Sequence, residues 1–456
     1  MKNKILTGLL LVLIGGWGSL SAQNVGSNYA RQVNTLIGTK GVGLTSGYLY
    51  PGATYPYGMV QFTPSYFSKR SGFVINQLSG GGCEHMGNFP PFPVKGKLKM
   101  SPDNILNYRI NISEEKGHAG YYEAKVQEDI HAKLTVTERT GMASYEYSAD
   151  QQYGTVIIGG GISATPIDQA AIVITAPNKC EGYAEGGNFC GLRTPYKVYF
   201  VAEFDTDALE SGTWKRNELK PNTTFAEGEY SGVYFTFDVN KKKNIQYKIG
   251  VSYVSVENAR ENLKAENTGW DFLQIQNQAE SKWNHYLGKI EVEGSNPDRT
   301  TQFYTHLYRS FIHPNVCSDV NGEYMGADFK VHKSRSKHYT SFSNWDTYRT
   351  QIQLLSILDP EVASDIVISH QLFAEEAGGA FPRWVMANIE TGVMQGDPTP
   401  ILISNAYAFG ARNYDPKPIF KTMRKGAEEP GAMSQEVEAR PGLKQYLDKG
   451  YYNASI

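Results

Sequence analysis

The stretch Gln246-Tyr-Lys-Ile-Gly-Val-Ser-Tyr-Val-Ser-Val-Glu-Asn-Ala-Arg-Glu-Asn-Leu-Lys-Ala-Glu266 marks a change in the kind of structure that the chain favours. As far as Val254, apolar and polar residues alternate, which is typical of a β-strand with one buried face. From Glu257 onward the spacing becomes helical. We therefore expect a β domain followed by an α domain, with the boundary near Val256.

The N-terminal side of this boundary consists of short alternating runs that Gly, Asn and Asp separate. Many short strands with turn signals between them are typical of an antiparallel sandwich, so we predict an N-terminal β-sandwich domain over residues 23–256. The clearest runs are residues 131–137, 143–148, 155–158, 196–204, 233–239 and 246–254.

Helical spacing continues on the C-terminal side. Residues 257–296 are predicted to form a helical linker, and residues 297–456 a helical domain. One helix is expected through Trp345 and Leu355. The pair Asp359-Pro360 should end it and begin the next, because Asp is a favoured N-cap and Pro suits the first helical position.

The same signals predict where a binding site would lie. The turn at Asp359 is tight, so the two helices that it joins should run antiparallel, with the connections on either side at one end. These connections, residues 313–344 and 377–396, are long, and long loops in compact domains are usually functional. Asp397-Pro398 repeats the helix-start signal, and we favour an N-cap role for Asp397.

The two loops carry side chains suited to a sugar. Such a ligand needs an apolar platform for its C–H face and paired donors or acceptors for adjacent hydroxyls, and Trp beside Asp or Arg offers both. Asp346 could instead favour a helix dipole and pair with Arg349. The predicted substrate-binding residues here are Trp345, Asp346, Arg383, Trp384 and Glu390, with Asn388 on the same rim.

A glycine run in the sandwich, Gly80-Gly-Gly-Cys-Glu-His85, provides a further candidate. It lacks the Lys-Ser/Thr pair that a phosphate-binding loop requires. A loop that reaches the helical domain would make Glu84 and His85 a second sugar subsite. The alternative, a polar loop that packs on itself, is equally open.

The first 22 residues resemble a secretory signal peptide, with Lys2 and Lys4, an apolar run from Ile5 to Ile14 and a small-residue end. The alternative is a buried N-terminal helix. No later run is long enough for a transmembrane segment after signal cleavage. The net charge of −2 argues against nucleic acid or an anionic membrane as a partner.

Export would permit disulfides among the four cysteines. Cys180 and Cys190 flank a glycine-rich loop and could close it, whereas Cys83 and Cys317 lie far apart in the sequence. A thiolate zinc site is not expected, because no C-x-x-C pair is present.

Several motifs, taken together, resemble the exo-acting α-mannosidases of glycoside hydrolase family 92. The matching stretches are distributed over nearly the whole chain beyond the leader. They are Val33-Asn-Thr-Leu-Ile-Gly-Thr39, Gly52-Ala-Thr-Tyr-Pro-Tyr-Gly-Met-Val-Gln61, Leu78-Ser-Gly-Gly-Gly-Cys83, residues 304–328, Asn344-Trp-Asp-Thr-Tyr-Arg349, residues 381–398 and Ala406-Tyr-Ala-Phe-Gly-Ala411.

The resemblance implies an N-terminal β-sandwich, a catalytic (α/α)6 barrel, and calcium-dependent hydrolysis of terminal α-mannosides with inversion, which needs a carboxyl acid and a carboxylate base. It implies that Trp345 and Asp346 hold the terminal mannose. It also implies that the catalytic acid, the base and the calcium ligands lie beyond Ile456, so that the chain is truncated and its barrel incomplete. No catalytic or metal-binding residue is therefore assigned.

The expected partner is a mannose-containing oligosaccharide or glycan, and the expected location is the periplasm or the extracellular space. A catalytically inactive mannoside-binding protein is the alternative function. A glycoside phosphorylase is disfavoured, because no basic cluster for phosphate accompanies the two loops.

Overall fold

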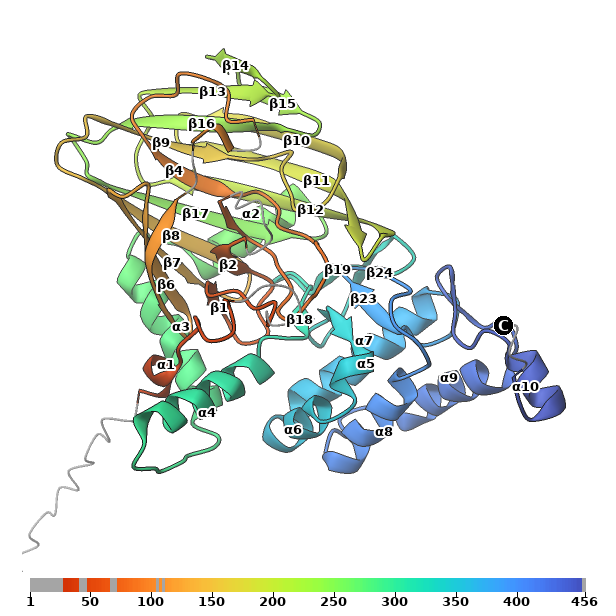
Figure 1. Cartoon of the computed structure of the whole chain (residues 1–456). Helices are drawn as coiled ribbons and strands as arrows, with labels where there is room; N and C mark the ends of the chain where they lie inside the picture. Colours follow the sequence, from red (N-terminus) through yellow and green to blue (C-terminus); the bar gives the residue numbers. More distant parts are fainter. Residues whose placement is uncertain (1–27, 41–46, 66–71, 104–105, 109–110, 453–456) are drawn as a thin grey trace, which may run out of the picture.

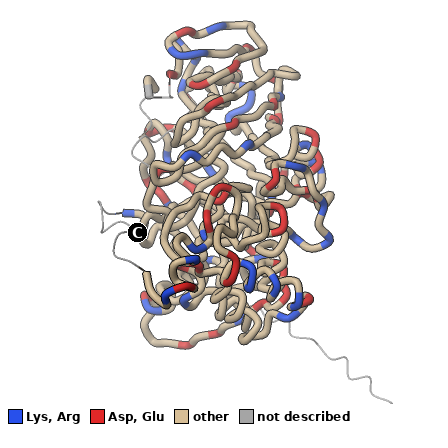
Figure 2. Tube along the Cα trace, turned by 90° about the vertical axis from the view of Figure 1, so that its right-hand side faces the viewer, with Lys and Arg blue, Asp and Glu red and all other residues tan. Residues whose placement is uncertain are grey.

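A computed structural model describes residues 28–40, 47–65, 72–103, 106–108 and 111–452. The expected signal peptide lies outside the described residues. An antiparallel β-rich region comes first and a helical region follows, as the sequence predicted (Figure 1). Basic and acidic residues are interspersed along the trace (Figure 2).

The larger sheet is antiparallel and has nine strands in the order β15-β10-β11-β12-β17-β8-β7-β6-β5. Its strands are β5 (Ile112–His118), β6 (Tyr121–Val126), β7 (Ile130–Val136), β8 (Thr140–Tyr147), β10 (Ile167–Ala176), β11 (Lys179–Phe189), β12 (Leu192–Phe204), β15 (Phe225–Glu227) and β17 (Asn244–Ser252).

A five-stranded antiparallel sheet in the order β14-β13-β16-β9-β4 forms the second layer. Its strands are β4 (Pro91–Lys95), β9 (Tyr153–Ile158), β13 (Glu210–Lys215), β14 (Glu218–Pro221) and β16 (Ser231–Asp238). A small sheet contains β1 (Ala53–Thr54), β2 (Gln61–Pro64) and β3 (Phe73–Val74).

Alternation along the strands builds the core between the layers. Every second residue along a strand points into the core. Leu134 on β7 and Tyr247 on β17 are examples, and both are fully buried in one hydrophobic cluster with Phe235 of the other sheet. The rings of Phe204 and Phe235 lie 5.0 Å apart across the layers. The period-two pattern therefore places one face of each sheet in the core, as expected of a sandwich.

Three helices follow the sandwich: α2 (Val256–Glu266), α3 (Phe272–Leu287) and α4 (Pro297–Ser310). Ser255, Asp271 and Asn296 cap them by accepting backbone N–H groups. A short helix, α1 (Tyr29–Gln32), packs against α3 and α4. The Trp283 indole of α3 donates to the Thr54 carbonyl at 2.7 Å, which fixes this helix against the small sheet.

The helical region contains α5 (Asn344–Thr347), α6 (Gln351–Leu358), α7 (Pro360–Glu376), α8 (Thr399–Phe409), α9 (Pro416–Glu428) and α10 (Leu443–Lys449). Short strands lie between these helices: β18 (Asn315–Val316), β19 (Glu323–Met325), β20 (Val331–Lys333), β21 (Tyr339–Thr340), β22 (Phe342–Ser343), β23 (Trp384–Met386), β24 (Ile389–Glu390), β25 (Met433–Ser434) and β26 (Val437–Glu438). None of the helices in the described residues is both long and apolar enough to cross a membrane.

The predicted helix start at Asp359 is confirmed, because its carboxylate accepts the Val362 N–H at 3.3 Å and Pro360 opens α7. The continuous helix predicted through Trp345 and Leu355 is wrong, since the chain breaks between α5 and α6. The side-chain amides of Gln353 and Asn405 donate to the Tyr348 carbonyl, and these bonds satisfy a group that the break leaves free.

Asp397 does not cap α8, so the predicted N-cap is wrong. The N-cap position is Pro398, without a side-chain cap, and the Asp397 carboxylate pairs with Arg440 at 2.9 Å. The Asp397 carboxylate therefore forms an ion pair with Arg440 and does not accept the backbone N–H groups of α8, although the Asp-Pro signal had indicated such a cap.

Candidate functional site

A pocket of about 550 Å³ lies where loops of the sandwich meet the helical region. Its walls combine apolar and aromatic side chains with hydroxyl, imidazole and carboxylate groups. The lining residues are Leu78, Ser79, Gly80, Gly81, Gly82, Cys83, Phe189, Cys190, Arg309, Ser310, His313, Ser341, Ser343, Asp346, Thr347, Gln351, Trp384, Val393 and Met394.

The two long loops meet at this pocket, as predicted. Strand β22 of the first loop pairs with β23 of the second, with Phe342 opposite Val385 and Ser343 opposite Trp384. Asp346 lies in α5, which follows β22, so this pairing brings its carboxylate and the Trp384 ring to one pocket.

Two histidines, the buried His85 and the half-buried His313, hold the glycine-rich loop that forms another wall. His85 Nε2 accepts the Leu78 N–H and His313 Nε2 accepts the Ser79 N–H, both at 2.8 Å. His85 Nδ1 donates to the Cys83 carbonyl at 2.7 Å. Burial lowers the pKa of each histidine to about 4, so both are neutral near pH 7, as acceptance of an N–H requires.

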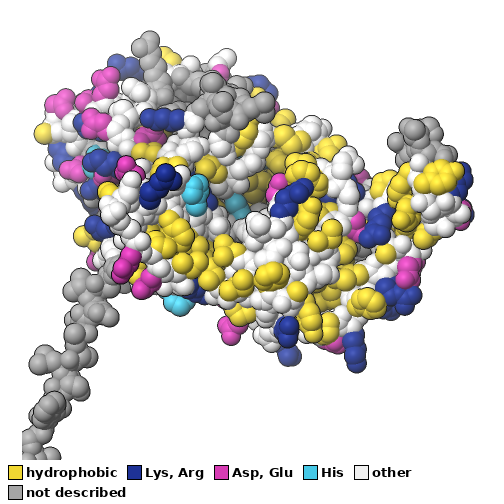
Figure 3. Space-filling view, turned by 60° about the horizontal axis from the view of Figure 1, so that its bottom comes forward, with side chains coloured by type: hydrophobic (Ala, Val, Ile, Leu, Met, Phe, Trp, Pro, Cys, Tyr) yellow, Lys and Arg dark blue, Asp and Glu magenta, His cyan; other side chains and the backbone are white. Residues whose placement is uncertain are grey.

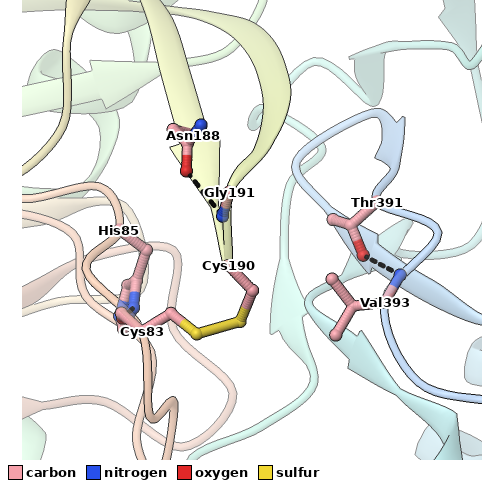
Figure 4. The surroundings of a disulfide bond; sticks show 7 residues. All are labelled: Cys83, His85, Asn188, Cys190, Gly191, Thr391 and Val393. Atoms are coloured by element: carbon pink, nitrogen blue, oxygen red, sulfur yellow. Dashed lines mark hydrogen bonds between the residues drawn. A yellow bond between two sulfur atoms is a disulfide. The ribbon is translucent and has the colours of Figure 1, made fainter.

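A disulfide joins Cys83 of this loop to Cys190 at the tip of the β11–β12 hairpin (Figure 4). The predicted closure of a loop by Cys180 and Cys190 is wrong. Cys180 points into the sandwich core, is fully buried and is a free thiol, as is the buried Cys317. Strand alternation explains the difference, because it turns Cys180 inward in the middle of a sheet.

The hairpin tip also contacts the helical region. The rings of Phe189 and Trp384 lie 4.5 Å apart, and Phe189 meets the His85 ring edge-on at 5.8 Å. Cys190 has φ 51° and Gly191 φ 87°, which form the tight turn that presents these groups. The segment with Thr391 and Val393 faces the disulfide across the pocket (Figure 4).

Of the predicted site residues, Asp346 and Trp384 line the pocket. Asp346 is exposed to solvent and accepts the Ser343 hydroxyl, while Trp384 is largely buried. Trp345 lies outside the lining, with the Arg349 guanidinium 4.5 Å from its ring centroid. Arg349 therefore stacks on this ring, whereas the sequence analysis considered it as an ion-pair partner of Asp346.

Arg383 and Glu390 lie behind the pocket and support its loop. Arg383 donates to the carbonyls of Gly396 and Met394, at 2.6 and 3.2 Å. The buried Glu390 accepts backbone N–H groups of Arg383, Trp384 and Gly392. Burial raises the pKa of its carboxyl, while these N–H groups oppose the rise. Both side chains shape the backbone next to Trp384.

Glu84 is exposed beside the disulfide and does not line the pocket, and Asn388 donates to the Gly326 carbonyl at 3.1 Å. Sequence reasoning did not identify the lining residues Phe189, Arg309 or His313. Gln351 was also missed, and its amide donates to the Ser310 and His313 carbonyls. No local motif marks these residues, because distant segments bring them together.

Within the described residues, three side chains with metal-binding atoms converge beside β19 and β20. Ligand atoms of Asp328, His332 and Glu376 lie within 4.8 Å of one another. Calcium prefers six to eight oxygen ligands, whereas this group includes an imidazole and lies outside the pocket lining. The group does not fit a calcium site that acts on a ligand in the pocket.

Two family models match the chain. The glycosyl hydrolase family 92 N-terminal domain matches residues 32–252, and the glycosyl hydrolase family 92 catalytic domain matches residues 258–455. A curated relative from Arthroderma benhamiae, described as an uncharacterized secreted glycosidase, is 25% identical over 492 residues, which cover 97% of this chain and 58% of the relative.

Solved structures share the fold. A family 92 α-mannosidase from Bacteroides thetaiotaomicron has a TM-score of 0.82 at 23% identity, over 92% of this chain and 58% of that one. An inverting family 92 mannosidase from the same species has a TM-score of 0.80 at 23% identity, over 94% and 59%. The chain thus spans about 58% of the length of these relatives.

Proposed function

Since this chain belongs to glycosyl hydrolase family 92, we propose that it acts on terminal α-mannosides and that the pocket between its two regions holds the terminal mannose. The observation that carries this proposal is the meeting of Asp346 and Trp384 at one pocket through the β22–β23 pairing. A carboxylate beside an indole supplies the two kinds of contact that a sugar ring needs. The relative that is named an α-mannosidase supports the choice of sugar.

In this proposal, each wall has a separate role. The rings of Phe189 and Trp384 offer the platform for the C–H face of the sugar, and their contact at 4.5 Å keeps the platform rigid. Asp346 accepts hydrogen bonds from adjacent hydroxyls, next to the Thr347 hydroxyl. The wall of residues 78–83 excludes water from the opposite side.

Hydrolysis with inversion and calcium dependence are further parts of the proposal. Inversion uses two carboxyl groups, about 6.5–9.5 Å apart, one as acid and one as base. We assign neither role to Asp346, whose solvent-exposed carboxylate suits the binding of hydroxyls. No step is assigned to calcium, because the described residues offer no oxygen-rich ligand set at the pocket.

We also propose export to the periplasm or the extracellular space. The Cys83–Cys190 disulfide supports this, because such bonds persist in oxidising compartments. The description of the curated relative as secreted also supports it.

The test is incubation of the purified protein with an α-mannobiose and calcium, with chromatographic detection of mannose. Mannose release that a calcium chelator stops would support the proposal. Binding by calorimetry without release would favour the alternative, a mannoside-binding protein without hydrolytic activity. The absence of both binding and release would contradict the proposal.

Matched variants locate the site. We expect Asp346→Asn to weaken mannobiose binding about tenfold or more, because truncated charged hydrogen bonds to a ligand cost roughly 1.5–3 kcal/mol. Glu84→Gln changes an exposed carboxylate on the neighbouring loop that does not line the pocket. The affinity of this variant should stay within about twofold of the parent, because the substitution removes no group that lines the pocket. Equal effects of the two variants would contradict the assigned position of the sugar.

A further inference from the structure

A second hollow, of about 670 Å³, lies on the outer face of the nine-stranded sheet, where α3 begins. It shares no lining residue with the pocket between the two regions. Helix α3 runs beside β6, β7 and β8 (Figure 1). The lining residues are Tyr121, Lys133, Ser144, Asn244, Gln246, Trp270, Asp271, Phe272, Leu273 and Gln276.

A row of polar side chains forms the floor. Lys133 on β7 lies opposite Ser144 on β8, and Ser144 lies opposite Gln246 on β17. Neighbouring strands are about 4.8 Å apart, so the row is roughly 10 Å long. Ser144 also donates its hydroxyl to Asn244 at 2.7 Å. The floor thus offers amide and hydroxyl groups over a length that matches two sugar rings.

Two of these side chains have no partner. Within the described residues, neither the Gln246 amide nor the Lys133 ammonium forms a hydrogen bond or ion pair. Other lysines of the same sheet do pair across strands, such as Lys197 with Glu185 at 3.4 Å. Glu123, which lies opposite Lys133, is engaged by His131 and Lys116. The free donors and acceptors therefore face the hollow.

An aromatic wall stands beside this row. The Trp270 ring, half-buried in the loop between α2 and α3, has the Lys248 ammonium 4.4 Å from its centroid. Lys248 is itself buried and donates to the Asn267 carbonyl at 3.1 Å, so the ring is held in place from beneath. A rigid ring loses little conformational freedom when a ligand packs on it.

The ring of Tyr121 is also held in place, by an aromatic contact and a hydrogen bond. Tyr121 meets Phe272 edge-on at 6.4 Å, and its hydroxyl donates to Glu123 at 2.9 Å. The Asp271 carboxylate caps α3 by accepting the Gln274 N–H at 3.1 Å, which leaves it less able to bind a cation. The wall is therefore mostly aromatic, and its carboxylate is engaged by the backbone of α3.

We propose that this hollow is a second carbohydrate-binding site, which binds two adjacent sugar units of a neutral α-mannan chain away from the pocket. Aromatic rings suit the C–H faces of pyranose rings, and amides and hydroxyls suit their hydroxyl groups. A single unpaired lysine is too little charge to select a phosphate-rich or nucleic-acid ligand. The choice of mannose rests on the proposed function, whereas the binding of a neutral sugar chain rests on the hollow alone.

The test is electrophoresis of the native protein through gels that contain soluble α-mannan. Binding slows migration, and the dependence on mannan concentration gives an apparent dissociation constant. We expect Trp270→Ala and Gln246→Ala to raise this constant, Trp270→Ala by on the order of tenfold, as for truncation of an aromatic anchor. If Trp270→Ala does not fold, the dissociation constants of Gln246→Ala and Lys133→Ala test the proposal. Both substitutions change half-exposed polar side chains.

Tyr183→Ala is the matched control. Tyr183 is a half-buried aromatic residue on the same sheet, with the Lys197 ammonium 4.2 Å from its centroid, but it lies outside the hollow. Its migration should equal that of the parent. Equal migration of the parent and the Gln246→Ala and Trp270→Ala variants would overturn the proposal, as would a parent that mannan does not retard.

A pocket variant separates this proposal from the proposed function. Trp384→Ala should abolish mannobiose binding at the pocket and leave the part of the mannan retardation that depends on Trp270. If that retardation remains but no mannose is released by the parent, the second site stands and the proposed hydrolysis fails. If Trp384→Ala removes all retardation, the hollow binds no mannan and the second site fails.

Discussion

At the scale of single residues, His85 and His313 determine how the pocket wall responds to pH. Each accepts a backbone N–H from the glycine-rich loop, at adjacent residues Leu78 and Ser79, and each comes from a different region of the fold. The loop is thus held by neutral imidazoles. Protonation of Nε2 in either histidine would replace the hydrogen-bond acceptor with a donor.

We expect acid to destabilise the protein over the range in which these histidines titrate. Their pKa in the folded state is about 4, below the ordinary 6.5, so the unfolded chain binds more protons between these values. The free energy of unfolding should therefore fall as the pH drops from about 6.5 to about 4. Each histidine contributes roughly 3 kcal/mol, at about 1.4 kcal/mol per pKa unit. Urea unfolding at several pH values measures this slope.

A variant isolates the contribution of one histidine. Burial also lowers the pKa of His338 and His370, to about 3 and about 4, so the slope is a sum over several groups. His85→Gln keeps an acceptor and a donor but does not titrate. Its unfolding free energy should depend less steeply on pH than that of the parent, and an unchanged slope would show that His85 does not carry the effect.

Sequence reasoning identified Asp346 and Trp384 as candidates because both lie on the loops that the helix signals placed together. It could not separate them from Arg383 and Glu390, whose partners are backbone groups of their own loop. The residue type shows which bonds a side chain can form. Whether a backbone group or a ligand takes those bonds depends on the conformation of the loop.

At the scale of elements, the Cys83–Cys190 disulfide joins the glycine-rich loop to the β11–β12 hairpin. The two cysteines are 107 residues apart, so the bond restrains a long segment of the unfolded chain. In the folded chain, the bond holds two pocket walls against each other next to Phe189.

We expect reduction of this bond to lower the free energy of unfolding by on the order of 4 kcal/mol, as chain-entropy models give for a loop of about 100 residues. Urea unfolding with and without a dithiol reductant measures the change. The double variant Cys83→Ser and Cys190→Ser should unfold as the reduced parent does and should not respond to the reductant.

The count of reactive thiols provides the control. Cys180 and Cys317 are buried free thiols, so they should react with a thiol reagent only after denaturation. Burial raises the pKa of both, which also slows their reaction in the folded state. Four reactive thiols in unreduced, denatured protein would contradict the pairing of Cys83 with Cys190.

The sequence predicted the strands and the start of α7 because alternation and capping are local signals. It did not predict the break between α5 and α6. There, Gln353 and Asn405 bond to the Tyr348 carbonyl, and Asn405 lies on another helix, α8. A bond from a distant element can interrupt a helix whose local pattern is continuous.

At the scale of the whole molecule, α8, α9 and α10 leave large apolar side chains in solvent. Figure 3 shows hydrophobic side chains spread over the face that these helices form. Phe420 of α9 is 62% exposed, which is unusual for a ring of this size. The other exposed apolar residues of these helices are Ile401, Tyr407, Phe409, Tyr446 and Leu447.

We expect this surface to cause association that increases with protein concentration, because large exposed apolar patches drive protein contacts. Light scattering coupled to size-exclusion chromatography measures the mass at several concentrations. Tyr407→Glu with Phe420→Glu should shift the protein towards the monomer. Leu209→Glu, at a residue 56% exposed in the sandwich, is the control and should leave association unchanged. A monomeric parent at every concentration would contradict the prediction.

The overall architecture was accessible from the sequence, because the change of period at Ser255 coincides with the end of β17 and the N-cap of α2. The way in which the sandwich and the helical region pack against each other could not be predicted from the sequence. Trp384 and Ile389 of the helical region belong to the same buried cluster as the sandwich core. Contacts between residues this far apart in the chain leave no periodic signal.

The position of the β11–β12 hairpin affects how ligand preference can change during the evolution of such a protein. Its strands belong to the sandwich, but its tight turn at residues 190 and 191 lies at the pocket. Insertions or exchanges at this turn would change what the pocket admits without altering either hydrophobic core. Selection could therefore modify ligand preference at one exposed turn while the two scaffolds stay the same.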